Sequence, residues 1–210
     1  GKLAVSTTDK SKFTLGKNLA TTPGEVVFQN DLMQLIQYTP TTKQVHEIPL
    51  LLIPAWINKY YIFDMQPENS LIKWLVSEGY TVFCVSWVNP DDALKEKTFA
   101  DYMQEGPLTA IDVIRDIANV DQVACMGYCL GGTLLAITLA YLHAKGQEHV
   151  VASATYLTTM INFSEPGELG VFIDEEQLRS LEDKMGTKGY LEGRDMATTF
   201  SMLRANDLIW

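Results

Sequence analysis

Four short runs, three of them almost wholly apolar, alternate with helix-type segments and constrain the fold of this 210-residue chain more than any other feature. The runs cover residues 48–54, 81–87, 122–127 and 151–159. Helix-type patterns cover about 67–79, 99–118 and 130–146. Apolar runs of this length are typical of strands buried on both faces, and their alternation with helices is typical of parallel sheets. The sequence therefore predicts an α/β protein with a mostly parallel sheet and helices on both faces.

Three regions of different composition indicate the domain organisation. Residues 1–23 are polar, and we expect them to lead in from an amino-terminal domain that this chain lacks. Residues 24–161 hold the predicted sheet, which opens with a hairpin around Asn30-Asp31. Residues 162–210 are acidic and interrupted by glycines, which predicts a cap or lid. Because Trp210 ends an apolar run in mid-pattern, we expect the chain to be truncated and its sheet incomplete.

Charge and composition exclude several functions. Sixteen Lys and Arg against 26 Asp and Glu give a net charge of −10 without any basic run, so nucleic acid is not an expected partner. No apolar run reaches the length of a membrane span, and no signal peptide opens the chain, which favours a cytoplasmic location. The three cysteines form no C-x-x-C pair, which favours a reducing compartment and no disulfide framework.

One cysteine lies where the third strand is predicted to join its helix, in the sequence G-x-C-x-G-G. In parallel sheets, chemistry takes place beyond the carboxyl ends of the strands, and Cys129 is at such an end. A strained turn that presents a nucleophile needs small residues two before and two after it, and Gly127 and Gly131 hold those positions. Gly132 adds clearance. The pattern predicts a nucleophile elbow with cysteine in place of serine.

The helix start beside this cysteine predicts the electrostatics of the site. Unpaired N–H groups and the helix dipole favour an anion at the join. The backbone N–H of Leu130, the residue after the nucleophile, is expected to donate to a developing oxyanion. The loop after residues 48–54 is expected to supply the second donor, for which we choose the N–H of Ile57, with Trp56 as the adjacent alternative.

Two alternatives compete with the elbow. A free cysteine is usually a small buried apolar residue, and we assign Cys84 and Cys125, both in the middle of predicted strands, to the core. Glycine-rich turns between strand and helix also bind phosphate groups. No G-K-[ST] follows this turn, and the sequence therefore excludes a P-loop.

A cysteine nucleophile for acyl transfer needs a histidine base and a supporting carboxylate, and none of the three histidines fits. His143 lies 14 residues along the same predicted helix, roughly 20 Å away at about 1.5 Å per residue. His46 and His149 precede strands, which places them at the opposite edge of the sheet. We therefore expect the catalytic Asp and His to lie outside this chain.

The sequence resembles class I polyhydroxyalkanoate synthases over nearly its whole length. The resemblance is carried by the stretches GKNLATTPGEVVFQNDLMQLIQYTP (16–40), PLLLIPAWINKYYIFDMQPENSLIKWLVSEGYTVFCVSWVNPD (49–91), MGYCLGGTLLA (126–136) and TFSMLRANDLIW (199–210). It implies an α/β-hydrolase fold, incomplete here, with the chain covering the amino-terminal half of the catalytic domain. It also implies that the missing Asp and His follow Trp210.

The resemblance further implies the reaction. Such enzymes polymerise (R)-3-hydroxyacyl-coenzyme A into polyester and release coenzyme A, and Cys129 matches the cysteine that carries the growing chain as a thioester. No metal is implied, and no cofactor, because coenzyme A is part of the substrate. The resemblance implies a homodimer, with dimer contacts in the cap, and association with polyester granules. The competing hypotheses are a thioesterase or polyester depolymerase of the same fold and a truncated, non-catalytic binding protein. We expect residues 1–210 alone to be inactive.

Overall fold

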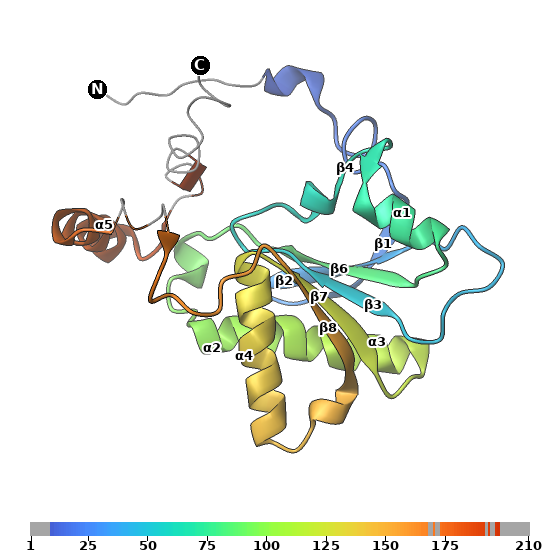
Figure 1. The fold of residues 1–210 in the computed structure, drawn as a ribbon. Helices are drawn as coiled ribbons and strands as arrows, with labels where there is room; N and C mark the ends of the chain where they lie inside the picture. Colours follow the sequence, from blue (N-terminus) through green and yellow to red (C-terminus); the bar gives the residue numbers. More distant parts are fainter. Residues whose placement is uncertain (1–8, 168–169, 171–172, 192, 194–195, 198–210) are drawn as a thin grey trace. The chain divides into compact units, whose positions relative to one another are not determined.

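The computed structural model describes residues 9–167, 170, 173–191, 193 and 196–197 of the chain (Figure 1). The chain forms two compact units. The larger unit comprises residues 14–88 and 97–161 and contains the central sheet. The smaller unit comprises the described residues of 1–13, 89–96 and 162–210.

The central sheet has six strands in the order β1-β2-β6-β3-β7-β8. They are β1 (Gly24–Gln29), β2 (Met33–Tyr38), β3 (Leu50–Ile53), β6 (Val82–Trp87), β7 (Val123–Tyr128) and β8 (Val151–Leu157). The strands β6, β3, β7 and β8 are parallel, whereas β1 and β2 form an antiparallel hairpin that pairs with β6. The Asn30 side chain closes this hairpin by accepting hydrogen bonds from the N–H groups of Leu32 and Met33. The predicted hairpin and parallel sheet are confirmed.

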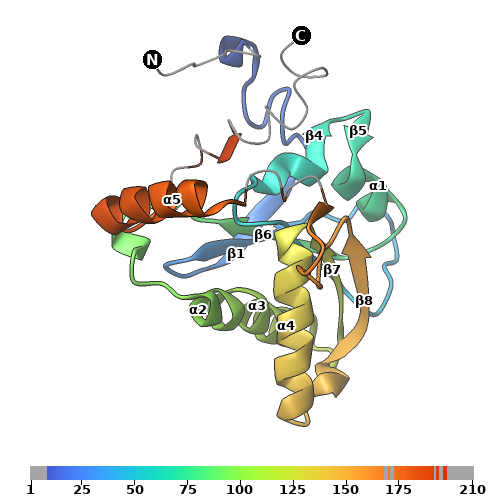
Figure 2. The ribbon, with the colours of Figure 1, turned by 60° about the vertical axis from the view of Figure 1, so that its left-hand side comes forward.

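Helices cover both faces of this sheet (Figures 1 and 2). The helix α1 (Leu71–Ser77) lies on one face, and α2 (Phe99–Met103), α3 (Thr109–Ala118) and α4 (Leu130–Ala144) lie on the other. Shorter elements are the 3-10 helices η2 (Tyr60–Phe63) and η5 (Glu148–Val150) and the small hairpin of β4 (Asp64–Gln66) and β5 (Asn69–Ser70). Among the described helices, none has both the length and the hydropathy needed to cross a membrane.

Alternation along the central strands divides the core into two layers. In β3, Leu51 and Ile53 face the layer under α3 and α4, whereas Leu50 and Leu52 face the layer under α1. Side chains in β6 alternate in the same way. Because both faces are covered, these strands carry almost no polar residues, and each buried aliphatic side chain contributes about 1.5–3 kcal/mol to the free energy of unfolding.

Two predicted helices differ from the observed ones. The helix expected from about residue 67 begins at Leu71, because the Ser70 hydroxyl accepts the N–H of Lys73 and caps the helix there, while residues 64–70 form the β4–β5 hairpin. The single helix expected over 99–118 is divided into α2 and α3 by a π-helical turn, η4 (Gln104–Leu108). Pro107 in this turn has no N–H to donate, which weakens regular α-helix at that position.

The smaller unit contains the 3-10 helices η1 (Lys10–Lys12) and η3 (Asp92–Leu94) and the helix α5 (Glu175–Lys188). Asp174 caps α5 by accepting the N–H of Gln177, and Gly189 ends it at φ 81°. Much of the predicted cap, namely residues 168–169, 171–172 and most of 192–210, lies outside the described residues, as do residues 1–8 of the predicted lead-in.

Candidate active site

Cys129 lies at the junction of β7 and α4, where the sequence predicts the elbow (Figure 1). Its backbone has φ 52° and ψ −125°, a conformation that costs a non-glycine residue about 1–3 kcal/mol. Three hydrogen bonds hold it there: its N–H donates to the Leu157 carbonyl at 3.0 Å, and its carbonyl accepts from the N–H groups of Gly132 at 2.9 Å and Thr133 at 3.2 Å. The Cys129 side chain is half-buried.

The three glycines of the elbow lie in close contacts, two of them with backbone atoms and one with a side chain. A Cβ on Gly127 would lie 2.8 Å from the backbone nitrogen of Gly132. A Cβ on Gly131 would collide with the carbonyl oxygens of Ile53 and Pro54 at the end of β3. A Cβ on Gly132 would collide with the Thr159 side chain. The first turn of α4 can therefore approach the ends of β3 and β7 only with glycine at these positions.

Backbone N–H groups are available on both sides of this approach. The N–H of Leu130 belongs to the first turn of α4, where a helix has no internal acceptor for it. In the loop after β3, the N–H of Asn58 donates a hydrogen bond to the Ala55 carbonyl at 2.9 Å. Within the described part of the chain, no hydrogen bond is donated by the N–H of Trp56 or Ile57. The N–H groups of Leu130, Trp56 and Ile57 are therefore the candidate donors to an anion at this site.

The other two cysteines are core residues in the structure. Cys84 and Cys125 are completely buried in β6 and β7. Burial raises the pKa of the Cys125 thiol to about 12. Burial, followed by the nearby Asp64, also raises the pKa of Cys84. Both therefore remain neutral thiols at physiological pH, unsuited to nucleophilic attack.

The three histidines lie away from the elbow. His143 is near the far end of α4, with its Nδ1 3.6 Å from a Glu148 carboxylate oxygen. His149 is in η5, directly before β8. His46 precedes β3, and its Nε2 lies 3.1 Å from the Glu78 carbonyl. All three are thus at the amino ends of the parallel strands, and Cys129 is at the carboxyl end.

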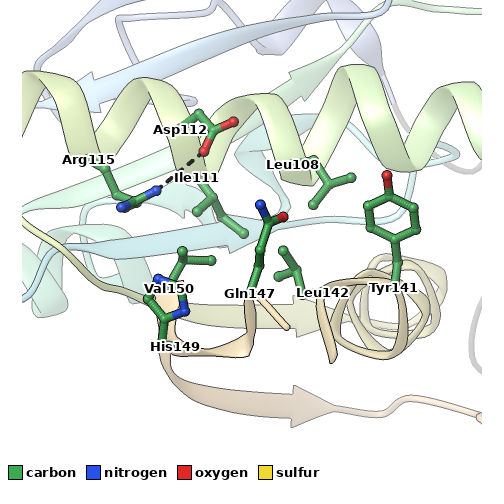
Figure 3. Close-up of a pocket in the computed structure, with 9 residues that line it drawn as sticks. All are labelled: Leu108, Ile111, Asp112, Arg115, Tyr141, Leu142, Gln147, His149 and Val150. Carbon is green, nitrogen blue, oxygen red and sulfur yellow. Dashed lines mark ion pairs between the residues drawn. The ribbon is translucent and has the colours of Figure 1, made fainter. Parts of the chain in front are cut away.

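A hollow of about 410 Å³ also lies at the far end, between α3, the end of α4 and η5 (Figure 3). It is lined by Leu108, Ile111, Asp112, Arg115, Tyr141, Leu142, Gln147, His149 and Val150. Arg115 and Asp112 form an ion pair of 3.6 Å at its rim. Tyr141 is 12 residues along α4 from Cys129, roughly 18 Å at 1.5 Å per residue. This hollow is therefore separate from Cys129.

A buried carboxylate was not foreseen from the sequence. Asp64 is 1% exposed and accepts hydrogen bonds from the Thr22 N–H at 3.1 Å, the Thr22 hydroxyl at 2.8 Å and the Ser70 hydroxyl at 2.6 Å. It ties residue 22 to the start of α1, directly after η2. Burial, with Cys84 and Asp64 adding to it, raises the pKa of neighbouring Tyr38. Among the described residues, no group of three or more His, Cys, Asp or Glu could hold a metal ion.

The fold and the elbow define the class of the protein: the chain belongs to the α/β-hydrolase fold family, whose model matches residues 48–187. Solved structures of the same fold include the Francisella virulence factor BioJ, with a TM-score of 0.54 at 15% identity over 74% of this chain and 50% of that one. A fungal esterase from Rhizomucor miehei gives 0.52 at 16% identity over 77% and 55%.

Within this family, the chain groups with the poly(3-hydroxyalkanoate) polymerases. It is 56% identical to the polymerase of Methylorubrum extorquens over all 210 residues, which are 34% of that protein. It is 46% identical to the polymerase subunit PhaC of Cupriavidus necator over 98% of this chain and 36% of that protein. A family model described as the N-terminus of poly-beta-hydroxybutyrate polymerase (PhaC) matches residues 1–75. The fold class and the family resemblance are confirmed, and the chain spans about a third of the length of these relatives.

Proposed function

We propose that this chain contributes the nucleophile of a polymerase that joins (R)-3-hydroxyacyl groups from coenzyme A thioesters into polyester. The observation that carries the proposal is the strained Cys129 at the junction of β7 and α4, in a chain 56% identical over its whole length to a poly(3-hydroxyalkanoate) polymerase. Of the three cysteines, it is the one that is not buried.

In the proposed first step, the Cys129 sulfur attacks the thioester carbonyl of the substrate. The carbonyl π electrons move to oxygen, and the N–H groups of Leu130 and Ile57 donate to the resulting oxyanion. Collapse of this intermediate forms the Cys129 thioester and breaks the bond to coenzyme A, which leaves as a thiol after taking up the proton lost from Cys129. The exchange of one thioester for another is nearly balanced in energy, so the step is readily reversible. A serine ester would be a deeper trap.

Chain growth then joins a hydroxyl group to the acylated thiol. The 3-hydroxyl of one unit attacks the thioester carbonyl of another, an ester forms, and the thiol is released with the hydroxyl proton. We expect an Asp and a His outside residues 1–210 to move these protons, because His46, His143 and His149 lie at the opposite end of the sheet. Association as a homodimer and with granules in the cytoplasm belongs to the same proposal.

The competing hydrolase hypothesis shares the elbow and differs in its product. The experiment uses the full-length polymerase that carries this sequence, incubated with 3-hydroxybutyryl-coenzyme A. Sedimenting polyester together with coenzyme A release is expected. Soluble 3-hydroxybutyrate without polymer would instead favour a thioesterase or depolymerase.

Substitution of the nucleophile tests the residue assignment. Cys129→Ala is expected to abolish coenzyme A release, whereas Cys125→Ala, in the preceding strand β7 and completely buried, is expected to retain it. Retained turnover in Cys129→Ala would refute the assignment and favour a non-catalytic role for this chain. Residues 1–210 alone are expected to show no turnover.

A further inference from the structure

The loop that follows β3 is held at a single carbonyl group by two other elements. The indole Nε1–H of Trp87, the last residue of β6, donates to the Pro54 carbonyl oxygen at 2.7 Å. On the other side, Gly131 in the first turn of α4 approaches so closely that a Cβ there would lie 2.7 Å from the same oxygen. The Pro54 peptide thus lies between the end of β6 and the start of α4.

Trp87 is itself fixed by its surroundings. It is 7% exposed, and its ring packs directly on Gly106 in the π-helical turn η4, where a Cβ would overlap the six-membered ring. Its ring centroid is 5.4 Å from that of Tyr102, and Tyr102 is 5.5 Å from Trp56 in the loop itself. The π-helical turn therefore places a glycine where regular side chains would push the indole away.

We infer that Trp87 is a positioning residue for the oxyanion donors, acting through the Pro54 carbonyl on the backbone N–H of Ile57. The inference rests on the proposed function, since it assigns Ile57 and Leu130 as the two donors. In this loop the N–H of Asn58 donates to the Ala55 carbonyl, whereas the positions of the Trp56 and Ile57 N–H groups depend on how the loop is anchored. A directional bond from a rigid, buried ring supplies that anchor.

Simple core packing would give the same burial of Trp87 and would predict a different response to substitution. If Trp87 only filled space in the core, Trp87→Phe would remove some ring volume and would have little effect on the position of the Pro54 carbonyl. If Trp87 instead positions the loop after β3, the indole N–H is the group that matters, and its loss in Trp87→Phe frees the loop to move relative to α4. A misplacement of about 1 Å near reacting atoms costs on the order of 100-fold in rate.

The test compares Trp87→Phe with the matched control Trp74→Phe in the full-length polymerase. Trp74 is 55% exposed on α1, so the same chemical change there leaves the loop untouched. A second variant, Gly106→Ala, displaces the Trp87 ring without removing the N–H. Steady-state release of coenzyme A from 3-hydroxybutyryl-coenzyme A gives kcat and KM, and kcat is divided by the fraction of Cys129 that reacts with a fluorescent iodoacetamide under native conditions, which counts the accessible thiols.

The expected result is a fall in kcat per reactive Cys129 of roughly 10- to 100-fold in Trp87→Phe and Gly106→Ala, with KM little changed and Trp74→Phe like the unmodified protein. An unchanged kcat per reactive thiol in both variants would overturn the inference and leave Trp87 a packing residue. The proposed function fails separately, through the product: if coenzyme A release yields only 3-hydroxybutyrate, the polymerase assignment is wrong, while the ratio between the variants still decides the role of Trp87.

Discussion

Replacing Gly131 by alanine would separate the two elements that form the candidate oxyanion hole. The new Cβ would lie 2.7 Å from the Pro54 carbonyl oxygen and close to the Ile53 oxygen as well. Because an unstrained carbon–oxygen contact is about 3.3 Å at its shortest, α4 and the loop after β3 must move apart by at least about 0.6 Å at the Pro54 oxygen. The Ile53 oxygen would be closer still to the new Cβ and requires a larger movement. Both partners are backbone, and no side-chain rotation can relieve the contact.

Two effects of that movement can be measured. Overpacking of this kind costs about 1–3 kcal/mol in the free energy of unfolding. A displacement of this size near the reacting atoms lowers the rate of acylation by about 10- to 100-fold, of the same order as the loss of one oxyanion donor. Chemical denaturation gives the first quantity. Single-turnover release of coenzyme A by the full-length polymerase gives the second.

Gly186→Ala is the matched control for this experiment. Gly186 is inside α5, where a Cβ would meet nothing within 4 Å. The same substitution is therefore expected to leave the rate unchanged and to stabilise the helix by about 0.5–1 kcal/mol. A Gly131→Ala protein with the stability and acylation rate of the unmodified chain would refute the steric argument, and with it the claim that the start of α4 and the Pro54 carbonyl fix each other.

Three further outcomes are expected. The raised pKa of Cys125 favours the folded state below pH 9, and this contribution falls between pH 9 and about pH 12, because the thiol of the unfolded chain ionises first. In that range the free energy of unfolding should fall by about 1.4 kcal/mol per pH unit through this thiol, and alkaline denaturation of Cys125→Ala should lack this slope. An identical slope in the variant would contradict the assignment. Asp64→Ala removes the acceptor of three hydrogen bonds and is expected to lower the free energy of unfolding by about 3 kcal/mol in a urea titration, with Thr22→Val losing less. Thr98→Ala removes the capping box of α2 and should cost about 1 kcal/mol, whereas equal stability would show that tertiary packing alone holds the helix.

Local patterns in the sequence predict those parts of the structure that depend on near neighbours. Strand β3 is recognisable because both of its faces are buried, which leaves no polar position in Leu50–Ile53. The elbow is recognisable because its glycines lie at fixed, short spacings around Cys129, although two of them are required by contacts with residues far along the chain. Helix α4 is likewise marked by its apolar composition.

The parts that escaped prediction depend on residues far apart in the chain. The bond from Trp87 to Pro54 spans 33 residues, and the bonds of Asp64 to Thr22 span 42. No sequence motif identifies either pair of partners, because a tryptophan at the end of a strand and a single aspartate after an aromatic run occur in many different structures. The π-helical turn places Gly106 against the Trp87 ring, and this contact between distant residues cannot be read from the periodicity of residues 99–118.

The backbone strain at Cys129 has a consequence for anyone who evolves this protein in the laboratory. Glycine adopts positive φ at no steric cost, so a selection for thermal tolerance alone rewards Cys129→Gly, which relaxes the turn and removes the sulfur. The most heat-resistant survivors of such a screen would therefore be enriched in inert proteins. Directed evolution of the full-length polymerase that carries this sequence therefore needs turnover as a second criterion in every round, because at residue 129 stability favours glycine and the proposed chemistry requires cysteine.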